Sequence, residues 1–380
     1  MKIGCLVLDL RVLLICGVIL WLIIAYLSPE MNVYKFVIQN EHTVPKITRP
    51  NSSPNSRTTP LKTLRTFWVD MEPYIANNLK LYNSSLCNIP NCLLADNISS
   101  ADIVVFSHRH IPRNVIDKKK GQIWIFFSGE SPYHTARPTR DWIDRFDLSM
   151  SYMKDSDIQM PIYGVFQKSQ KQFLKNYSNI LKTKTKDAVW LTSHCKTPSR
   201  RENLVKDLGK YLSIDIFGEC GDKKCGGRYE GLSKCLPLFE TNYKFYFSFE
   251  NSICNQYTTE KLHSLYLEHT ALIPVINGPK DATQYIPKGT YINSQDFTNA
   301  ALLAYELKQI GSNETEYIRY LKEKDKYTTK TLDKIVQETQ CNLCKYLVDI
   351  ENGKKARKNN SWVNILNPGV YCTDKSFCIT

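Results

Sequence analysis

The chain has 380 residues, of which 42% are hydrophobic, 11% aromatic and 23% charged, so it carries enough apolar material for ordinary cores. This composition excludes a disordered, collagen-like or low-complexity chain, and the length suits two globular domains. The formal net charge of +13 favours an anionic partner. Because the basic residues are scattered among 37 acidic ones, the sequence does not indicate a nucleic-acid-binding surface.

The N-terminal segment predicts a membrane anchor. Residues 12–27 form an apolar run without a charge, and Lys2 and Arg11 precede it. We therefore expect residues 1–11 in the cytoplasm, a transmembrane signal-anchor at 12–27 and the remaining chain in the lumen. A cleaved signal peptide is the alternative, although no clear small-x-small cleavage site follows the run. Residues 28–61 are polar and rich in Pro, Asn, Ser and Thr, which is typical of a flexible stem.

The cysteines fit the same compartment. Eleven of the 13 lie beyond the anchor, as expected for disulfides in an oxidising lumen. An odd number leaves one thiol free or intermolecular, and the spacing does not give the connectivity. Cys341 and Cys344 also have the spacing of zinc ligands, but no second such pair accompanies them, so we favour a disulfide role. Six Asn-x-Ser/Thr sequons agree with a lumenal location.

Globular signals begin after the stem. Short apolar runs at 66–69, 102–106 and 122–127 have the character of buried strands and predict an N-terminal α/β domain over 62–184. A Lys- and Thr-rich stretch at 182–186 reads as the linker to the next domain.

The second half of the chain repeats a strand–helix–strand alternation. The segments are 187–191, 201–212 and 213–217, and then 245–249, 258–268 and 271–276. Each repeat predicts two parallel strands joined by a helix, so we expect a second α/β domain over 185–340. A cysteine-containing tail without a strong period follows at 341–380. Two domains of this type leave a ligand-binding cleft at the carboxyl ends of their strands.

Polar residues follow the predicted strand 245–249 directly, among them Glu250 and Asn251. The next helix begins with Glu260 and Lys261, and its free backbone N–H groups suit an anion. The helix dipole disfavours a cation at this end, so Lys261 predicts a bound negative group. The alternative is a solvated Glu–Lys pair on a helix face.

Three further features bear on chemistry. Arg200 and Arg201 precede a predicted helix and can clamp a diphosphate, although a surface basic pair is the alternative. Asp155-Ser-Asp157 has the DxD form that binds Mn²⁺ or Mg²⁺, but about one such triplet is expected by chance, so we predict no metal there. Neither a Walker motif nor GxGxxG occurs in the sequence.

A candidate general base follows the predicted strand 122–127. Glu130 sits at the edge of that strand, where a carboxylate can take a proton from a hydroxyl. His134 is a competing base. The alternative for Glu130 is a hydrogen-bonded structural carboxylate.

Four ordered blocks resemble the α1,3-fucosyltransferases of glycosyltransferase family 10, Golgi enzymes that use GDP-fucose. The blocks are FFSGESPYHT (126–135), FDLSMSYMKDSDIQMPIYG (146–164), SRR (199–201) and the segment 243–261 with YKFYFSFENS and YTTEK. The DSD triplet lies inside a family block, which further separates it from metal binding. TSHC (192–195), DIFGECGDKKC (215–225) and Cys254 make the chain more similar to invertebrate and plant core α1,3-type enzymes, which fucosylate the asparagine-linked GlcNAc of N-glycans.

The resemblance implies a GT-B fold of two facing Rossmann-like domains, with the donor on the C-terminal one. It implies Glu130 as the catalytic base, Arg201 and Lys261 as phosphate-binding cations and Glu260 as the ribose-binding carboxylate. The remaining donor-pocket positions are Tyr246, Asn251 and Tyr257. Two positions depart from the family pattern: the turn 267–271 lacks the usual Gly, and His263-Ser264 replaces bulkier residues.

The resemblance further implies inverting transfer of fucose from GDP-fucose to the N-glycan of a glycoprotein. No cofactor or metal is required, and stimulation by Mn²⁺ or Mg²⁺ stays open. The expected location is the Golgi membrane, in a single-pass type II orientation with a lumenal catalytic part. Two alternatives remain: Lewis-type transfer to antenna LacNAc or LacdiNAc, and an inactive glycan-binding relative.

Overall fold

The computed structural model describes residues 63–89, 91–170, 175–226, 232–278, 282–354 and 366–373. The predicted anchor and stem lie outside these residues, and so does Cys378. In the described part of the chain, no helix is both long and apolar enough to cross a membrane. The described residues belong to a single compact unit that begins at Thr59.

The first sheet has six strands in the order β2-β1-β3-β4-β5-β6, and every neighbouring pair is parallel. The strands are β1 (Leu64–Val69), β2 (Cys92–Leu94), β3 (Ile103–Ser107), β4 (Ile123–Ser128), β5 (Leu148–Ser151) and β6 (Ile158–Gln159). The central strands β3 and β4 are buried along their whole length. Burial on both faces explains why they are continuous apolar runs rather than alternating ones.

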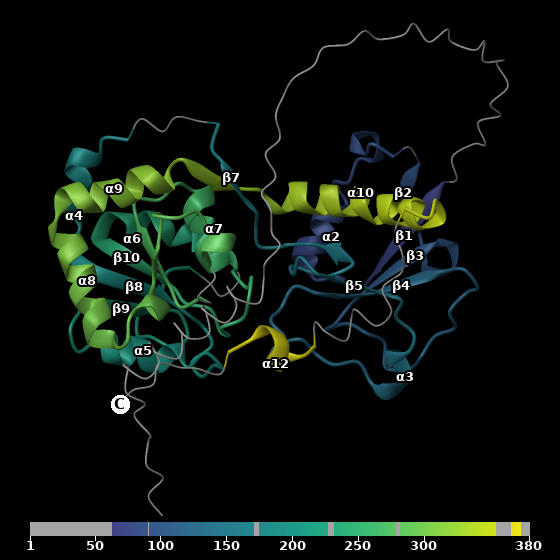
Figure 1. Cartoon of the computed structure of the whole chain (residues 1–380), viewed down its shortest axis with the longest axis horizontal. Helices are drawn as coiled ribbons and strands as arrows, with labels where there is room; N and C mark the ends of the chain where they lie inside the picture. The colour runs from purple at the N-terminus through teal and green to yellow at the C-terminus, as the bar shows by residue number, and fades with distance from the viewer. Residues whose placement is uncertain are drawn as a thin grey trace, which may run out of the picture. The chain divides into compact units, whose positions relative to one another are not determined.

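Helices cover both faces of this sheet (Figure 1). α2 (Pro73–Leu79) and α10 (Leu332–Glu351) pack on one face, around Trp68, Phe127 and Met150. On the other face, α3 (Arg140–Ile143) contributes Trp142 to an aromatic cluster with Phe106, Trp124 and Phe146. The first predicted strands are therefore confirmed, and they form the core of the N-terminal half.

The second sheet has five strands in the order β12-β11-β10-β8-β9, again all parallel. Its strands are β8 (Lys186–Leu191), β9 (Ile214–Phe217), β10 (Tyr243–Ser248), β11 (Ile273–Ile276) and β12 (Ile292–Asn293). The helices around it are α5 (Arg201–Leu208), α6 (Leu236–Asn242), α7 (Glu260–Leu267), α8 (Ala300–Ser312) and α9 (Glu314–Lys324). Both predicted strand–helix–strand units are confirmed, as β8-α5-β9 and β10-α7-β11.

Short elements complete the described chain. β7 (Phe166–Lys168) and β13 (Tyr327–Thr329) form a two-stranded antiparallel sheet. α4 (Ile180–Thr183), α12 (Pro368–Tyr371) and six 3₁₀ turns are the remaining helical elements among the described residues: Ser84–Leu86, Ile98–Ser100, Tyr177–Asn179, Leu232–Lys234, Ala282–Gln284 and Ser294–Asp296. Inside the predicted linker 182–186, Lys184 is buried, and its ammonium group donates to the carbonyl oxygens of Glu240 and Tyr243.

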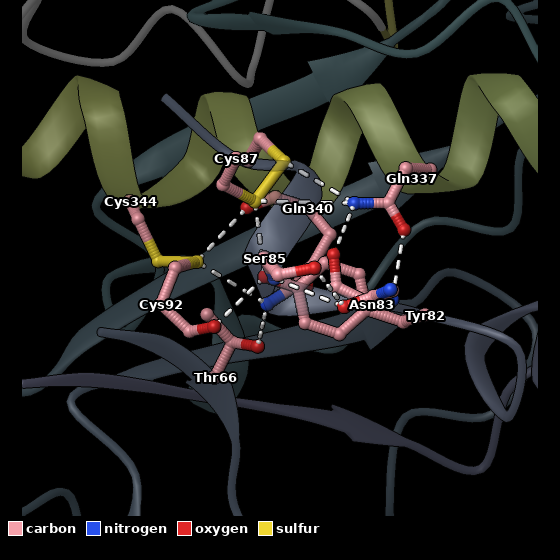
Figure 2. Close-up of a disulfide and its surroundings, with 10 residues drawn as sticks. Thr66, Tyr82, Asn83, Ser85, Cys87, Cys92, Gln337, Gln340 and Cys344 are labelled. Atoms are coloured by element: carbon pink, nitrogen blue, oxygen red, sulfur yellow. Dashed lines mark hydrogen bonds between the residues drawn. A yellow bond between two sulfur atoms is a disulfide. The ribbon is translucent and has the colours of Figure 1, made fainter. Parts of the chain in front are cut away.

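The C-terminal tail is more ordered than its sequence suggested. α10 begins at Leu332 and runs through the predicted boundary at 341, because its apolar residues pack on the first sheet. Two disulfides, Cys87–Cys341 and Cys92–Cys344, join the helix to that sheet. Figure 2 shows Gln340 between them, donating to the Thr66 hydroxyl.

The Cys341-x-x-Cys344 motif thus holds two separate disulfides rather than zinc ligands. The other bridges among the described residues are Cys195–Cys220, Cys225–Cys235 and Cys254–Cys372. The turn after α7 places His269 at a φ of 47°, a left-handed conformation that favours glycine. A glycine at this position would adopt the same conformation without strain.

Candidate functional site

Two cavities lie at the carboxyl ends of the parallel strands. The first, of about 300 Å³, is lined by five of the predicted donor-site residues, namely Arg201, Tyr246, Asn251, Glu260 and Lys261. The second, of about 500 Å³, is lined by the predicted base Glu130. Glu260 lines both, so the predicted base and the predicted cations face neighbouring parts of one site. Tyr257 is the one predicted residue that, within the described chain, lines neither cavity.

Arg201 is the first residue of α5 and is only 2% exposed. Its Nη1 donates to the carbonyl of Phe249 at 2.5 Å, and its Nη2 donates to Oγ1 of Thr192 at 3.0 Å. Burial lowers the pKa of this guanidinium, although nearby carboxylates oppose the effect. The guanidinium is fixed by these bonds, while its Nε has no hydrogen-bond partner within the described chain. A fixed cation at the wall of a cavity suits an anionic ligand.

The start of α7 is held by a buried carboxylate. Glu250 accepts from the backbone N–H of Thr259 at 2.7 Å and from its hydroxyl, so it anchors the residue that precedes the helix. Burial raises the pKa of Glu250. Its carboxylate lies 3.6 Å from Nζ of Lys261, which also contacts Oε1 of Glu260 at 2.9 Å. Burial lowers the pKa of Lys261, but the two carboxylates outweigh this effect and raise it.

Lys261 is thus a charged ammonium group in the first turn of α7, and the anionic ligand expected there stays a prediction. The helix dipole disfavours the charge there, and two carboxylates compensate it. The exposed side chain of Glu260 leads from this pair toward the second cavity. The alternative of a solvated Glu–Lys pair does not fit the structure, because only 21% of the Lys261 side chain is exposed.

Tyr246 and Asn251 complete the first cavity. Tyr246 lies on β10 and is 1% exposed, and Asn251 follows the end of that strand. The backbone carbonyl of Asn251 accepts from the N–H of Ser199, whereas its side-chain Oδ1 is buried without a partner among the described residues. An unpaired amide oxygen beside a cavity can accept a hydrogen bond from a ligand donor.

Glu130 follows the end of β4 and accepts two hydrogen bonds. Nη2 of Arg109 donates to Oε1 at 2.7 Å, and the hydroxyl of Tyr257 donates to Oε2 at 2.9 Å. The Glu130 side chain is 17% exposed, so it is open to the cavity while both of its oxygens are oriented. An ionised carboxylate held in this way can accept a proton from a hydroxyl group.

His134, the other candidate base, has a different environment. Nδ1 of His134 contacts the hydroxyls of Ser131 and Ser252 at 3.2 and 3.1 Å, and burial lowers the pKa of the ring. The residues that line the two described cavities do not include His134. The geometry therefore favours Glu130 as the base.

The DxD triplet has structural partners. Asp157 accepts from the backbone N–H and the hydroxyl of Ser149, both at 2.8 Å, and Asp155 accepts from the hydroxyl of Tyr371. Among the residues that the structure describes, no group of three or more His, Cys, Asp or Glu is arranged to hold a metal ion. The carboxylates of the triplet join β5 and the C-terminal segment to the segment that carries them.

Several residues at the site were not predicted. His194 and Lys224 line the first cavity, and Glu72, Arg109 and Tyr163 line the second. Arg109 and Glu72 follow closely after β3 and β1. The rule that marked Glu130 and Asn251, polar residues just beyond a buried strand, would have marked them as well.

Comparison with known proteins agrees with this geometry. A family model described as "Glycosyltransferase family 10 (fucosyltransferase) C-term" matches residues 181–362, and one described as "Fucosyltransferase, N-terminal" matches residues 62–164. Among solved structures, the chain is similar to one titled "Crystal Structure of alpha1,3-Fucosyltransferase with GDP-fucose". The TM-score is 0.52 at 16% identity, with 81% of this chain and 96% of that chain covered. This likeness confirms the α/β fold with parallel sheets.

Curated relatives point to the same family. The chain is 34% identical over 239 residues to "Alpha-(1,3)-fucosyltransferase fut-1" of Caenorhabditis elegans, covering 61% of this chain and 53% of the relative. It is 30% identical over 307 residues to "Glycoprotein 3-alpha-L-fucosyltransferase A" of Drosophila melanogaster, covering 77% and 57%. It is 29% identical over 289 residues to "4-galactosyl-N-acetylglucosaminide 3-alpha-L-fucosyltransferase 9" of Mus musculus, covering 73% and 76%. The chain spans just over half the length of the two invertebrate relatives, whose origin agrees with the expected invertebrate likeness.

Proposed function

Because the chain belongs to the fucosyltransferases of glycosyltransferase family 10, we propose that it transfers fucose from GDP-fucose in α1,3 linkage to GlcNAc of glycoprotein N-glycans. The proposed acceptor is the core GlcNAc attached to asparagine. The observation that carries the proposal is the shared wall of the two cavities. It brings an oriented carboxylate, Glu130, next to a cavity lined by Arg201 and Lys261.

On the donor side, the first cavity receives the diphosphate. Arg201 and Lys261 neutralise the negative charge that grows on GDP as the bond to fucose C1 breaks. Removing one electrostatic donor to developing charge costs about 2.7–4 kcal/mol of transition-state stabilisation. Since Glu250 and Glu260 already hold Lys261 in place, little reorganisation is required when the nucleotide binds.

On the acceptor side, Glu130 takes the proton from the 3-hydroxyl of GlcNAc. The oxygen then forms a bond to fucose C1 from the face opposite the departing GDP, so the configuration at C1 inverts. The proton remains on the Glu130 carboxyl, and the negative charge leaves with GDP. Arg109 and Tyr257 orient the two carboxylate oxygens for this transfer.

A second candidate keeps the chemistry and changes the acceptor. The relative from Mus musculus is named for a 4-galactosyl-N-acetylglucosaminide, which is an antenna unit. This likeness favours antenna LacNAc as the alternative acceptor. An acceptor panel distinguishes the two: a glycopeptide that carries only the N-glycan core, and free LacNAc and LacdiNAc.

We further propose a Golgi location with a single-pass type II orientation, which rests on the charge and hydropathy of residues 1–27. The proposed reaction requires no bound metal, since Arg201 and Lys261 supply the positive charge. Adding Mn²⁺ or Mg²⁺ to chelator-treated protein tests for stimulation. Imaging of the tagged full chain with compartment markers tests the location.

The proposed activity is tested by incubating the purified protein with GDP-fucose and the acceptor panel. We expect release of GDP together with a fucosylated core glycopeptide whose linkage, located by mass spectrometry, is α1,3 to the proximal GlcNAc. Transfer to LacNAc alone would establish the second candidate. A folded protein that binds no GDP in calorimetry would contradict both.

The Glu130→Gln variant tests whether Glu130 acts as the base or binds the nucleotide. The amide keeps the size of the side chain but cannot take the proton, so we expect turnover to fall by about 10²- to 10⁴-fold while GDP affinity is retained. Glu316→Gln on α9, a partly exposed glutamate paired with Arg319, is the matched control and should leave both values unchanged. Weak GDP binding by a folded Glu130→Gln protein would instead assign Glu130 to the donor site.

A further inference from the structure

Glu72 is a carboxylate with an unusual position. It is the N-cap residue of α2, but its side chain makes no capping hydrogen bond. Instead Oε1 accepts from the hydroxyl of Ser107 at 2.8 Å, at the end of β3. Oε2 is buried and has no hydrogen-bond partner among the described residues. A buried carboxylate oxygen without a donor is unfavourable, so this atom calls for a donor from a ligand.

Glu72 lines the second cavity, which is also lined by the proposed base. Glu72 and Glu130 both line this space of about 500 Å³, which lies within the usual range for small-molecule sites. The phenol groups of Tyr74 and Tyr163 line it too, and both interact electrostatically with Glu130 and Glu260. Aromatic rings beside a few oriented polar groups are typical of pockets that bind an uncharged, partly apolar ligand such as a sugar ring.

The chemistry of the proposed acceptor sugar indicates which of its groups would donate a hydrogen bond to Glu72. A carboxylate only accepts hydrogen bonds, so Glu72 requires an O–H or N–H. In both candidate acceptors the GlcNAc is substituted at O4. With the 3-hydroxyl at Glu130, the only donor on a carbon next to C3 is then the N–H of the 2-acetamido group.

We propose that Glu72 accepts the acetamido N–H of the acceptor GlcNAc and so fixes the sugar with its 3-hydroxyl at Glu130. The inference rests on the proposed function and adds the acceptor contact to it. The Glu72 carboxylate, pinned by Ser107, orients the ring, and Tyr74 and Tyr163 contact its faces and edges. Because a site with a fixed, otherwise unpaired acceptor discriminates against ligands that lack the donor, this contact selects N-acetylated sugars.

The test pairs a protein variant with a ligand variant. The ligands are the acceptor that the wild type uses and its analogue with a 2-azido group, which keeps a nitrogen at C2 but cannot donate. The wild type should use the azido analogue with a kcat/KM about 10- to 100-fold lower, mostly through a higher acceptor KM. Glu72→Ala should use both acceptors equally poorly, while its GDP affinity stays at the wild-type value.

Two further variants serve as controls. Glu72→Gln retains an accepting oxygen of similar reach and should discriminate more than Glu72→Ala does. Glu316→Ala, on α9, should behave as wild type. Equal use of both acceptors by the wild type would overturn the inference without any variant having to fold. Undiminished discrimination by Glu72→Ala would also overturn it. No fucose transfer by the wild type to any acceptor would overturn the proposed function, and this inference with it.

Discussion

Two roles are open to Tyr257. The family resemblance assigns it to the donor pocket, whereas its hydroxyl donates to Oε2 of Glu130 at 2.9 Å and its ring packs on Tyr152. A hydrogen bond to a charged group contributes about 1.5–3 kcal/mol, so an orienting role predicts that Tyr257→Phe lowers kcat by roughly 10- to 100-fold. The KM for GDP-fucose should remain at the wild-type value.

Steady-state kinetics with each substrate varied in turn checks this prediction. Tyr305→Phe, an exposed tyrosine on α8, controls for loss of a hydroxyl elsewhere. If Tyr257→Phe raises the KM for GDP-fucose and spares kcat, the hydroxyl serves the nucleotide and moves away from Glu130 when the nucleotide binds.

Some of the site residues follow from local sequence patterns, and others do not. Glu130 and Asn251 could be found because each follows a buried strand, and parallel strands bring such positions together. The hydrogen-bond partners of Arg201 could not be predicted from the sequence. Thr192 and the carbonyl of Phe249 are 9 and 48 residues away along the chain, and no local pattern links them to the guanidinium. Long-range polar contacts depend on the packed geometry of the sheet.

A C-terminal segment braces the loop that carries Tyr257. The disulfide Cys254–Cys372 joins the two, and backbone bonds run from Asn255 N to the Tyr371 carbonyl at 2.7 Å and from Thr373 N to the Ile253 carbonyl at 2.9 Å. The hydroxyl of Tyr371 in turn donates to Asp155. The brace therefore fixes the segment from which Tyr257 reaches Glu130.

Replacing Cys254 and Cys372 by alanine should loosen this segment and weaken the hydrogen bond from Tyr257 to Glu130. The expected loss of kcat is therefore no larger than the loss caused by Tyr257→Phe. Made in the Tyr257→Phe background, the double replacement should reduce kcat no further, since coupled residues are not additive. Removing Cys87–Cys341 should spare kcat, because neither of these cysteines lines either cavity. Full additivity of the two changes would contradict the brace.

The elements themselves were largely predictable, with one informative exception. Strands β3 and β4 are nearly continuous apolar runs because both faces of their sheet are covered, and β8 and β10 each contain a shorter apolar run of three or four buried residues. α10 was missed although Ile335, Val336, Leu343 and Leu347 lie on one face at helical spacing. The predicted boundary at 341 divided this pattern at its cysteines. Those cysteines pair with residues about 250 positions away, which local reading does not reveal.

Two neighbouring disulfides close almost the same long loop of the chain. Cys87–Cys341 and Cys92–Cys344 have sequence separations of 254 and 252 residues, and both hold α10 on the first sheet. When one bridge is intact, the other closes only a small ring in the unfolded chain, because residues 87–92 and 341–344 are already linked. The entropy of the long loop is therefore restored only when both bridges are removed.

This loop geometry predicts a departure from additivity. Replacing one pair by alanine should lower the free energy of unfolding by about 2–3 kcal/mol, whereas replacing both pairs should lower it by clearly more than twice that amount. Denaturant unfolding of the wild type, the two single-bridge variants and the double variant provides the comparison. The variant without Cys225–Cys235, a bridge of 10-residue separation, gives the reference for a small ring. If the losses of unfolding free energy in the two single-bridge variants simply add, the bridges stabilise the protein through local packing around Gln340 and Thr66 rather than by constraining the unfolded chain.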